Sequence, residues 1–175
     1  IVTIKSQNII DQCLKSIDPD VKKIIVENST DQSFIDSLKE KYKNIECYIT
    51  GSNLGMGAGN NFGIIRSKTR YVMILNPDTI LKKDTLSQIF EASKNLEFAI
   101  LSPLSDNKDY PNYKILKDLK NNKNPLFEVD QIDGYAMVLD KNQFNEIRKQ
   151  LNSYVVLSHK DQVITVGHRY KRRRN

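Results

Sequence analysis

The sequence predicts an α/β fold in which helices flank a mainly parallel sheet. Up to about residue 101, short apolar runs typical of strands alternate with segments whose apolar residues recur at helical spacing. Residues 71–75 are apolar at every position, as expected of a strand that is buried on both faces of a sheet. Polar residues or glycines follow several of these runs, and the ligands of parallel sheets bind beyond the carboxyl ends of the strands.

Each expected element has its own local signature. The expected strands are residues 1–4, 23–27, 45–50, 71–75 and 98–101, which are rich in Ile, Val and other apolar residues. The expected helices are marked by apolar residues at helical spacing: Ile9, Ile10, Cys13, Leu14 and Ile17; Phe34, Ile35, Leu38 and Tyr42; Ala58, Phe62 and Ile65; Leu86, Ile89 and Phe90. Pro19 closes the first helix, and residues 28–31 (NSTD) form a turn and helix-cap cluster.

The pattern loosens after Pro103. Residues 106–125 are polar and contain prolines, so we expect a surface loop or lid there. Apolar segments return at residues 126–129, 135–139, 154–157 and 163–166.

Size and composition indicate one folded domain. The chain has 175 residues, of which 39% are hydrophobic and 27% charged, as in globular rather than disordered proteins. No apolar run approaches the roughly 20 residues that span a bilayer. Cys13 and Cys47 lack metal-ligand spacing and are expected to be buried, reduced thiols, which favours a cytoplasmic location.

The net charge of +6 comes from the end of the chain. Five basic residues lie within the last seven, and without them 22 basic residues remain against 21 acidic ones. Nucleic-acid-binding domains spread their basic residues over a face, so we expect no nucleic-acid partner. The tail of residues 169–175 is either a peripheral contact with anionic lipid at the inner membrane face or a solvated end.

The stretch of residues 53–78 combines the features of a nucleotide-phosphate and metal site. Gly55, Gly57 and Gly59 let the backbone turn tightly and approach a ligand, and the helix that follows directs free N–H groups at it. Asp78, after the next strand, is placed to hold a divalent cation against the phosphate. An ordinary strand-to-helix loop is one alternative. A Rossmann fingerprint is another, because Asp78 lies 19 residues beyond Gly59.

Two further residues are candidates on position alone. Glu27 ends the second strand, and its carboxylate could accept the N3–H of uracil or thymine, or a ribose hydroxyl. The alternative is an exposed acid near a helix N-terminus. His168 precedes the basic run and is a candidate for contact with a metal or diphosphate; the alternative is an ordinary surface or core histidine.

Taken together, these motifs resemble the family 2 glycosyltransferases of GT-A fold, a Rossmann-like α/β architecture, and especially their rhamnosyltransferase-like branch. The matching segments are residues 1–3 (IVT), 13–17 (CLKSI), 26–31 (VENSTD), 53–63 (NLGMGAGNNFG), 75–78 (LNPD) and 133–137 (DGYAM). They cover roughly residues 1–140.

The resemblance implies a role for each matching residue. Thr3 and Glu27 match the positions that hold the base, although the family more often has Asp at the second of them. Asn53, Gly55 and Asn60 match the loop along the ribose and diphosphate. Asp78 matches the metal-binding motif, which implies a Mg or Mn ion. Asp133 and Gly134 match the acceptor-side wall.

The resemblance implies a metal-dependent glycosyltransferase similar to the hexosyltransferases. It would transfer a sugar from a UDP- or dTDP-sugar to an acceptor hydroxyl, with inversion at the anomeric carbon. The acceptor would be a glycan or a lipid-linked molecule, in surface polysaccharide or glycan synthesis. The nucleotide-binding part is about residues 1–104 and the acceptor-side part about 126–168.

One part of the family pattern is absent from this sequence. The family has an acidic segment that supplies the catalytic base, but here Phe144 runs directly into Asn145. We therefore expect residues to be missing near 144/145 and at the C-terminus, and Asp133 is a weak substitute candidate. The competing hypotheses are a Rossmann-type NAD-binding enzyme and a non-catalytic module that binds nucleotide or docks through its tail.

Overall fold

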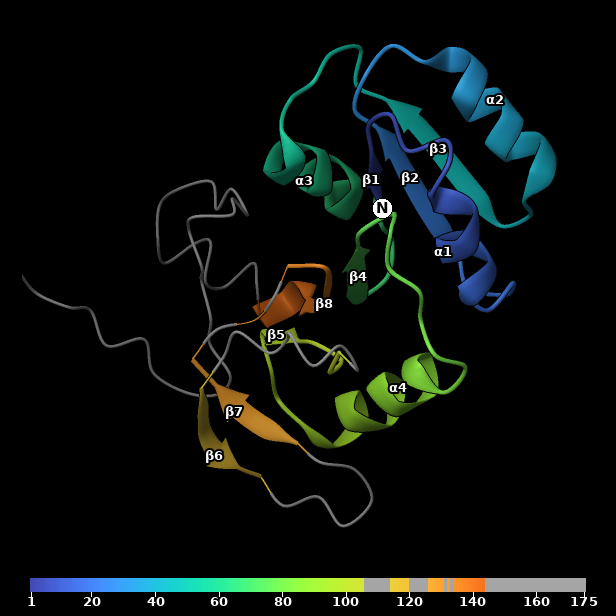
Figure 1. Ribbon diagram of the computed structural model, residues 1–175. Coiled ribbons are helices and arrows are strands. Elements are labelled where there is room, and N and C mark those ends of the chain that lie inside the picture. The colour runs from blue at the N-terminus through green and yellow to red at the C-terminus, as the bar shows by residue number, and fades with distance from the viewer. Residues whose placement is uncertain (106–113, 120–125, 131, 133, 144–175) are drawn as a thin grey trace, which may run out of the picture.

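The computed structural model of the chain describes residues 1–105, 114–119, 126–130, 132 and 134–143 (Figure 1). In chain order the elements are β1 (Val2–Thr3), α1 (Ile10–Ser16), β2 (Lys23–Glu27), α2 (Gln32–Lys41), β3 (Ile45–Ile49), α3 (Met56–Arg66), β4 (Tyr71–Leu75), α4 (Thr85–Asn95), β5 (Ile100–Leu101), β6 (Ile115–Asp118), β7 (Phe127–Val129) and β8 (Ala136–Asp140). Up to residue 101 this order matches the alternation of strands and helices that the sequence predicts.

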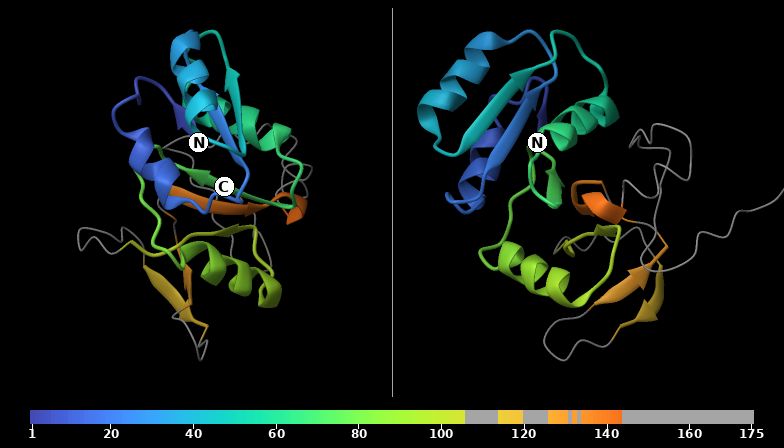
Figure 2. Two further views of the ribbon diagram at one scale, coloured as in Figure 1. Left: turned by 90° about the vertical axis from the view of Figure 1, so that its right-hand side faces the viewer. Right: turned by 180° about the vertical axis from the view of Figure 1, so that it is seen from behind.

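A parallel sheet of order β1-β2-β3 carries the amino-terminal half, with helices on both of its faces (Figures 1 and 2). Successive residues of a strand face opposite sides of the sheet, so Ile25 and Val26 point to different helices. Ile25 lies in one core cluster with buried residues of α1 and α2. Val26 faces α3, where it would meet a Cβ added at Gly63. The predicted α/β architecture with a helix-flanked parallel sheet is confirmed.

A second, mixed sheet has the order β4-β8-β5. β8 pairs antiparallel with both of its neighbours, so β4 and β5 run parallel to each other with β8 inserted between them. Leu139 of β8 is fully buried. In β4, only Ile74 and Leu75 are buried and Tyr71–Met73 are half-buried, so the prediction of burial along the whole strand is right for its second half alone.

Helix α3 does not bury the apolar stripe that the sequence suggests. Its buried residues are Gly57, Gly59, Asn60 and Ile64, whereas the side chain of Ile65 is 68% exposed. A Cβ added at Gly59 would lie 2.8 Å from Val2 Cγ1, so the helix lies too close to β1 for a larger residue there. The buried face of α3 is formed largely by small residues. The spacing of its large apolar residues therefore predicts the wrong face of the helix to be buried.

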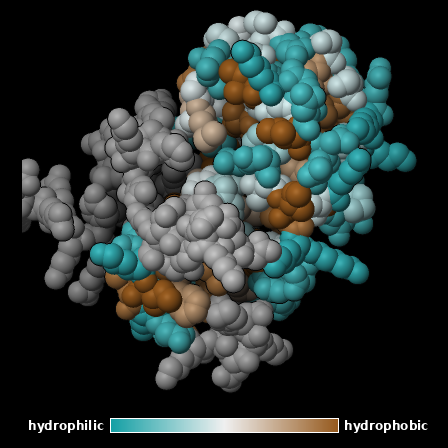
Figure 3. Space-filling model, viewed as in Figure 1, coloured by the Kyte–Doolittle hydropathy of each residue, from teal (hydrophilic) through white to brown (hydrophobic). Residues whose placement is uncertain are grey.

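The strand β6 lies inside the segment that the sequence predicts to be a loop. It pairs antiparallel with β7, and its residues are all exposed. Apolar side chains gather on this hairpin in Figure 3. Ile115 and Leu116 of β6 are both more than half exposed. Residues 106–113 and 120–125, the segments 154–157 and 163–166, the junction at 144/145 and the basic tail lie outside the described residues.

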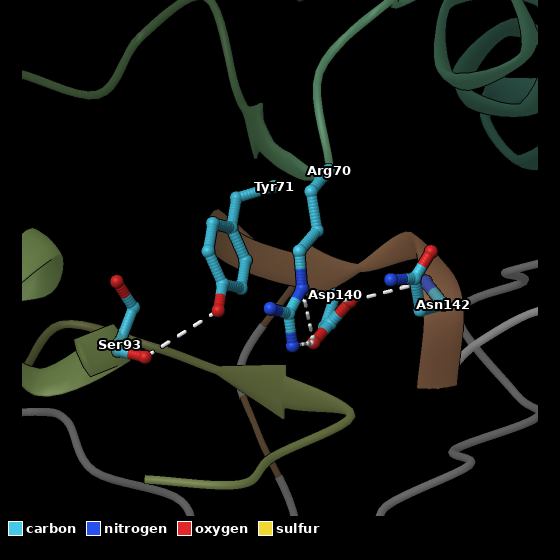
Figure 4. Close-up of polar contacts among 5 residues, drawn as sticks. All are labelled: Arg70, Tyr71, Ser93, Asp140 and Asn142. Carbon is cyan, nitrogen blue, oxygen red and sulfur yellow. Dashed lines mark hydrogen bonds and ion pairs between the residues drawn. The ribbon is translucent and has the colours of Figure 1, made fainter. Parts of the chain in front are cut away.

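A charged pair joins the start of β4 to the end of β8 (Figure 4). The Arg70 guanidinium donates from Nη2 and Nε to the Asp140 carboxylate, with distances to Oδ2 of 2.7 and 3.1 Å. Burial alone would raise the pKa of Asp140, but Arg70 and the Asn142 N–H outweigh it and hold that pKa below its usual value. This pair lies at the amino end of β4, opposite the end that carries Asp78.

Among the helices of the described residues, none combines the length and the apolar character that crossing a membrane requires.

Candidate functional site

The carboxyl ends of β1 and β2 bring Thr3 and Glu27 together. The two residues are register partners, and Thr3 Oγ1 donates a 2.6 Å hydrogen bond to Glu27 Oε2. The Ser29 hydroxyl donates to the other carboxylate oxygen, and the Asp31 N–H donates to Ser29 Oγ at 3.1 Å. Both oxygens of the Glu27 carboxylate are therefore occupied by hydroxyl donors.

Glu27 is not the exposed acid that the sequence allows as an alternative. Its exposed fraction is 0% and that of Thr3 is 1%. The residue that serves the following helix is Asp31, whose carboxylate accepts a 3.0 Å hydrogen bond from Phe34 N at the start of α2. A buried carboxylate that is hydrogen-bonded through both oxygens is a fixed feature of this end of the sheet.

The loop before α3 contains less of the glycine-rich segment than the sequence suggests. Helix α3 begins at Met56, so only Gly55 precedes it, while Gly57 and Gly59 lie within its first turns. Gly55 is the N-cap residue and has φ of +81°, a conformation that residues with a Cβ rarely adopt. The absence of a side chain at Gly59 allows a close approach to Val2 of the protein itself.

Asn28, for which the sequence predicts a place in a turn and helix-cap cluster but no role in the site, organises this loop. Its side chain is 2% exposed and is bonded to four loop residues, Thr50, Asn53, Leu54 and Gly55. Oδ1 accepts from Leu54 N at 3.0 Å and from Thr50 Oγ1 at 3.1 Å. Nδ2 donates to Asn53 Oδ1 at 3.1 Å and to Gly55 O at 3.2 Å.

The predicted phosphate-side residues differ in their surroundings. Asn53 is exposed, and its Oδ1 also accepts a 2.9 Å hydrogen bond from Gly55 N. Asn60 is buried on α3, with an exposed fraction of 9%, and lines a cavity instead of the open loop.

That cavity has a volume of about 420 Å³ and lies among β2, α3, β4 and α4. Most of its lining is apolar, for example Ile24, Val72 and Ile89, and of the predicted site residues it contains Gly59 and Asn60. It lacks the carboxylates that a metal-nucleotide site requires, so it is not the candidate site.

Asp78 lies exposed in the turn that follows β4. This turn is anchored on the segment before β8: Tyr135 O accepts a hydrogen bond from Asn76 N at 2.8 Å and from Thr79 Oγ1 at 3.4 Å. Gly134 directly precedes Tyr135, so the structure brings the predicted metal ligand and the predicted acceptor-side segment together.

A buried thiol is hydrogen-bonded to the same turn. Cys13 is 0% exposed, and its Sγ donates to Asn76 O at 3.6 Å. Burial raises the pKa of the Cys13 thiol to about 11, and the negative charge of Asp78 adds to this effect. Cys13 and Cys47 are both free thiols, as the sequence predicts, but only Cys13 is buried; Cys47 is half-buried, so the prediction of burial is wrong for that residue.

Within the described part of the chain, no group of three or more His, Cys, Asp or Glu side chains could by itself hold a metal ion. Mg²⁺ is commonly bound through one or two carboxylates together with substrate phosphates, so Asp78 alone fits a site that a nucleotide completes. Asp133 and His168, the other predicted contributors, lie outside the described residues.

Comparisons with known proteins relate the chain to one family. The model of the family described as "Glycosyl transferase family 2" matches residues 1–156. A low-salt glycan biosynthesis hexosyltransferase, Agl10 of Haloferax volcanii, is 23% identical over 167 residues, which cover 84% of this chain and 53% of the relative. An uncharacterized glycosyltransferase of Haemophilus influenzae is 27% identical over 135 residues, covering 75% of this chain and 50% of the relative.

Among solved structures, the chain is similar to residues 1–349 of S. aureus TarS. The TM-score is 0.62 at 12% identity, and the match covers 87% of this chain and 48% of that structure. At this identity the similarity concerns the fold alone. The chain spans about half the length of the curated relatives it matches.

Proposed function

The chain belongs to glycosyl transferase family 2, and from this premise we propose that it transfers a sugar from a UDP- or dTDP-sugar to an acceptor hydroxyl with inversion at the anomeric carbon. The relative from Haloferax volcanii is a hexosyltransferase of glycan biosynthesis, which supports a hexosyltransferase role in surface polysaccharide or glycan synthesis. The proposed acceptor is a glycan or a lipid-linked one, and the rhamnosyltransferase-like branch remains part of the proposal.

One observation supports this function best. The turn with Asp78 is hydrogen-bonded to Tyr135 O, next to Gly134. A transferase must hold the leaving diphosphate and the acceptor side by side, because the acceptor oxygen attacks the carbon from which the diphosphate leaves. In this chain the proposed donor-side carboxylate and the proposed acceptor-side segment are adjacent.

Asp78 is the proposed ligand for a Mg or Mn ion. Such an ion would neutralise the charge that develops on the leaving diphosphate. Asn53 and Gly55 are proposed to lie along the ribose and diphosphate, at the N-terminus of α3 where N–H groups favour anions. Asn60 shares this helix but is buried, so we propose that it supports the helix from the interior.

Thr3 and Glu27 are proposed to select the nucleobase. A carboxylate has roughly four acceptor positions, and Glu27 uses two of them for hydroxyl groups. It therefore retains the capacity to accept the N3–H of uracil or thymine, a group that cytosine lacks, once the atoms that cover it move aside.

The reaction also needs a carboxylate base to take the proton from the acceptor hydroxyl. Asp133, outside the described residues, is the proposed candidate for this role, and the acceptor-side wall is proposed to include Gly134. His168 is proposed as a further contact of the metal or diphosphate.

Calorimetric titration with UDP, dTDP and NAD, each with and without MnCl₂, tests the donor site. We expect binding of UDP or dTDP that depends on Mn and that Asp78→Ala weakens by tenfold or more, since about 1.4 kcal/mol corresponds to a factor of ten. Asp20→Ala removes an exposed carboxylate from a turn elsewhere and is expected to leave binding unchanged.

Two results would count against the proposal. Binding of NAD without metal would favour the Rossmann-type enzyme, and absence of any nucleotide binding would favour a docking module.

For a docking module, we propose that the tail of residues 169–175 contacts anionic lipid. Pelleting with vesicles that contain phosphatidylserine, with and without the tail, tests this contact.

A further inference from the structure

We propose that Asn28 is a positioning residue of the donor site, which acts by fixing the orientation of the Asn53 side chain. This inference rests on the proposed function, because it assumes that the loop of residues 50–55 contacts the nucleotide diphosphate. Neither the family match nor the motif comparison assigns a role to Asn28. The argument comes from the hydrogen bonds of its carboxamide.

Apart from the hydrogen bonds of Gly51 N to Ser29 O at 3.1 Å and of Thr50 Oγ1 to Ser52 O at 2.7 Å, the loop depends mainly on Asn28 for its order. Residues 51–55 are all exposed, so burial of apolar side chains contributes little to their order. Gly51 and Gly55 both have positive φ, at +77° and +81°, and glycine is the residue that gives a chain the most freedom to leave such a conformation. Hydrogen bonds must therefore supply the order, and Asn28 makes four of them.

The Asn28 carboxamide is held through both of its polar atoms. Its two N–H groups donate to Asn53 Oδ1 and Gly55 O, and its oxygen accepts from Leu54 N and shares the single proton of the Thr50 hydroxyl with Ser52 O, which lies closer at 2.7 Å. Its orientation is set by the Leu54 N–H, which requires an acceptor, and this leaves Nδ2 as the donor to the Gly55 carbonyl, which also accepts from Gly59 N at 3.0 Å. Aspartate or alanine at this position cannot provide both.

Asn53 is fixed as a consequence. Its Oδ1 accepts from Asn28 Nδ2 at 3.1 Å and from Gly55 N at 2.9 Å, so the oxygen side of the amide is directed to the protein. Within the described residues its Nδ2 makes no hydrogen bond. The side chain is exposed, so this NH₂ group is available to donate to a ligand oxygen. An anionic diphosphate oxygen is the acceptor with which such a donor forms a strong bond.

A double-mutant cycle tests whether Asn28 acts through Asn53. Binding of UDP and dTDP with MnCl₂ is measured for the wild type, Asn28→Ala, Asn53→Ala and the double variant. We expect each single variant to weaken binding by about tenfold, the usual effect of losing one hydrogen bond to a charged group. The double variant is expected to resemble Asn53→Ala alone, because Asn28 has no further effect once Asn53 is absent.

Two controls separate positioning from general destabilisation. Tyr42→Phe removes a side-chain hydrogen bond to Asp11, in the α1–α2 interface. It is expected to lower the melting temperature without weakening nucleotide binding. Asn28→Asp has nearly the same volume as the wild type and replaces Asn28→Ala in the cycle if the alanine variant does not fold.

The outcomes distinguish this inference from the proposed function. If the wild type binds neither nucleotide, both fail. If the wild type binds and the two single effects multiply to about a hundredfold in the double variant, or Asn28→Ala binds as well as the wild type, only the inference fails. Hydrogen exchange of the nucleotide-free protein gives a second measurement: Asn28→Ala must accelerate exchange at the Leu54 and Gly55 amides, and unchanged exchange there also overturns the inference.

Discussion

Thr3 and Glu27 lie opposite each other on adjacent parallel strands, and the hydroxyl of the first donates a 2.6 Å hydrogen bond to the carboxylate of the second. Neither side chain is more than 1% exposed. A buried carboxylate loses its hydration, so the hydroxyl groups of Thr3 and Ser29 replace the water that Glu27 would bind in the unfolded chain.

Thr3→Val tests this relationship, because valine keeps the shape of threonine and removes only the hydroxyl. We expect the free energy of unfolding to fall by about 1–3 kcal/mol, the effect of leaving a buried polar group with one partner fewer. Urea denaturation measures it. Thr30→Val, the same change at an exposed position, is the control and is expected to have little effect. Equal stability of the two variants would show that the Thr3 hydroxyl is not needed.

Gly59→Ala tests the contact between α3 and β1. In an ordinary helix position this change stabilises by about 1 kcal/mol. Here the new Cβ would lie 2.8 Å from Val2 Cγ1, and overpacking of this kind costs about 1–3 kcal/mol. We therefore expect net destabilisation in urea, and recovery of stability when Val2→Ala is added to Gly59→Ala. A single variant that is more stable than the wild type would contradict the close approach.

The Arg70–Asp140 pair predicts a dependence of stability on pH. The folded state holds the pKa of Asp140 below its unfolded value of about 3.9, so the pair contributes stability above that value. This contribution is lost as the pH falls through the folded pKa. Arg70→Met leaves the buried carboxylate of Asp140 without its cation, and we expect the free energy of unfolding to fall at pH 7.

The same variant makes the sign of this effect measurable. The stability difference between wild type and Arg70→Met must shrink as the pH is lowered below 4, because protonated Asp140 no longer needs a cation. Lys68→Met removes a nearby exposed cation and provides the control. A difference that is constant from pH 7 to pH 3 would refute the role of the charged pair.

Cys13 is expected to be unreactive in the folded protein. Its thiol is fully buried and its pKa is raised to about 11, so almost no thiolate exists at pH 8. In a Cys47→Ser variant, reaction with Ellman's reagent should occur only as fast as the protein unfolds. Cys13→Ser leaves the half-buried Cys47, which should react without global unfolding. Rapid labelling of native Cys13 would contradict its burial against Asn76.

The alternation of elements could be predicted from the sequence because it depends on local patterns. The bounds of β2 and β4 agree with the apolar runs at residues 23–27 and 71–75. The carboxyl-end site could be predicted in outline for the same reason, since parallel strands bring their ends to one edge of a sheet. Thr3 and Glu27 follow from this rule, whereas Asp78 follows β4, which lies in the second sheet and pairs with β8 in antiparallel orientation.

The sequence by itself therefore determined the α/β class, the family and the edge of the sheet where the candidate site lies. Only the tertiary structure decided that β8 inserts between β4 and β5, that Gly59 serves packing against Val2, and that Asn28 holds the loop before α3. The physical reason is the range of the interactions. Hydrophobic periodicity reports the burial of neighbours along one element, whereas these three features depend on atoms that are distant in the sequence and meet only when the chain is folded.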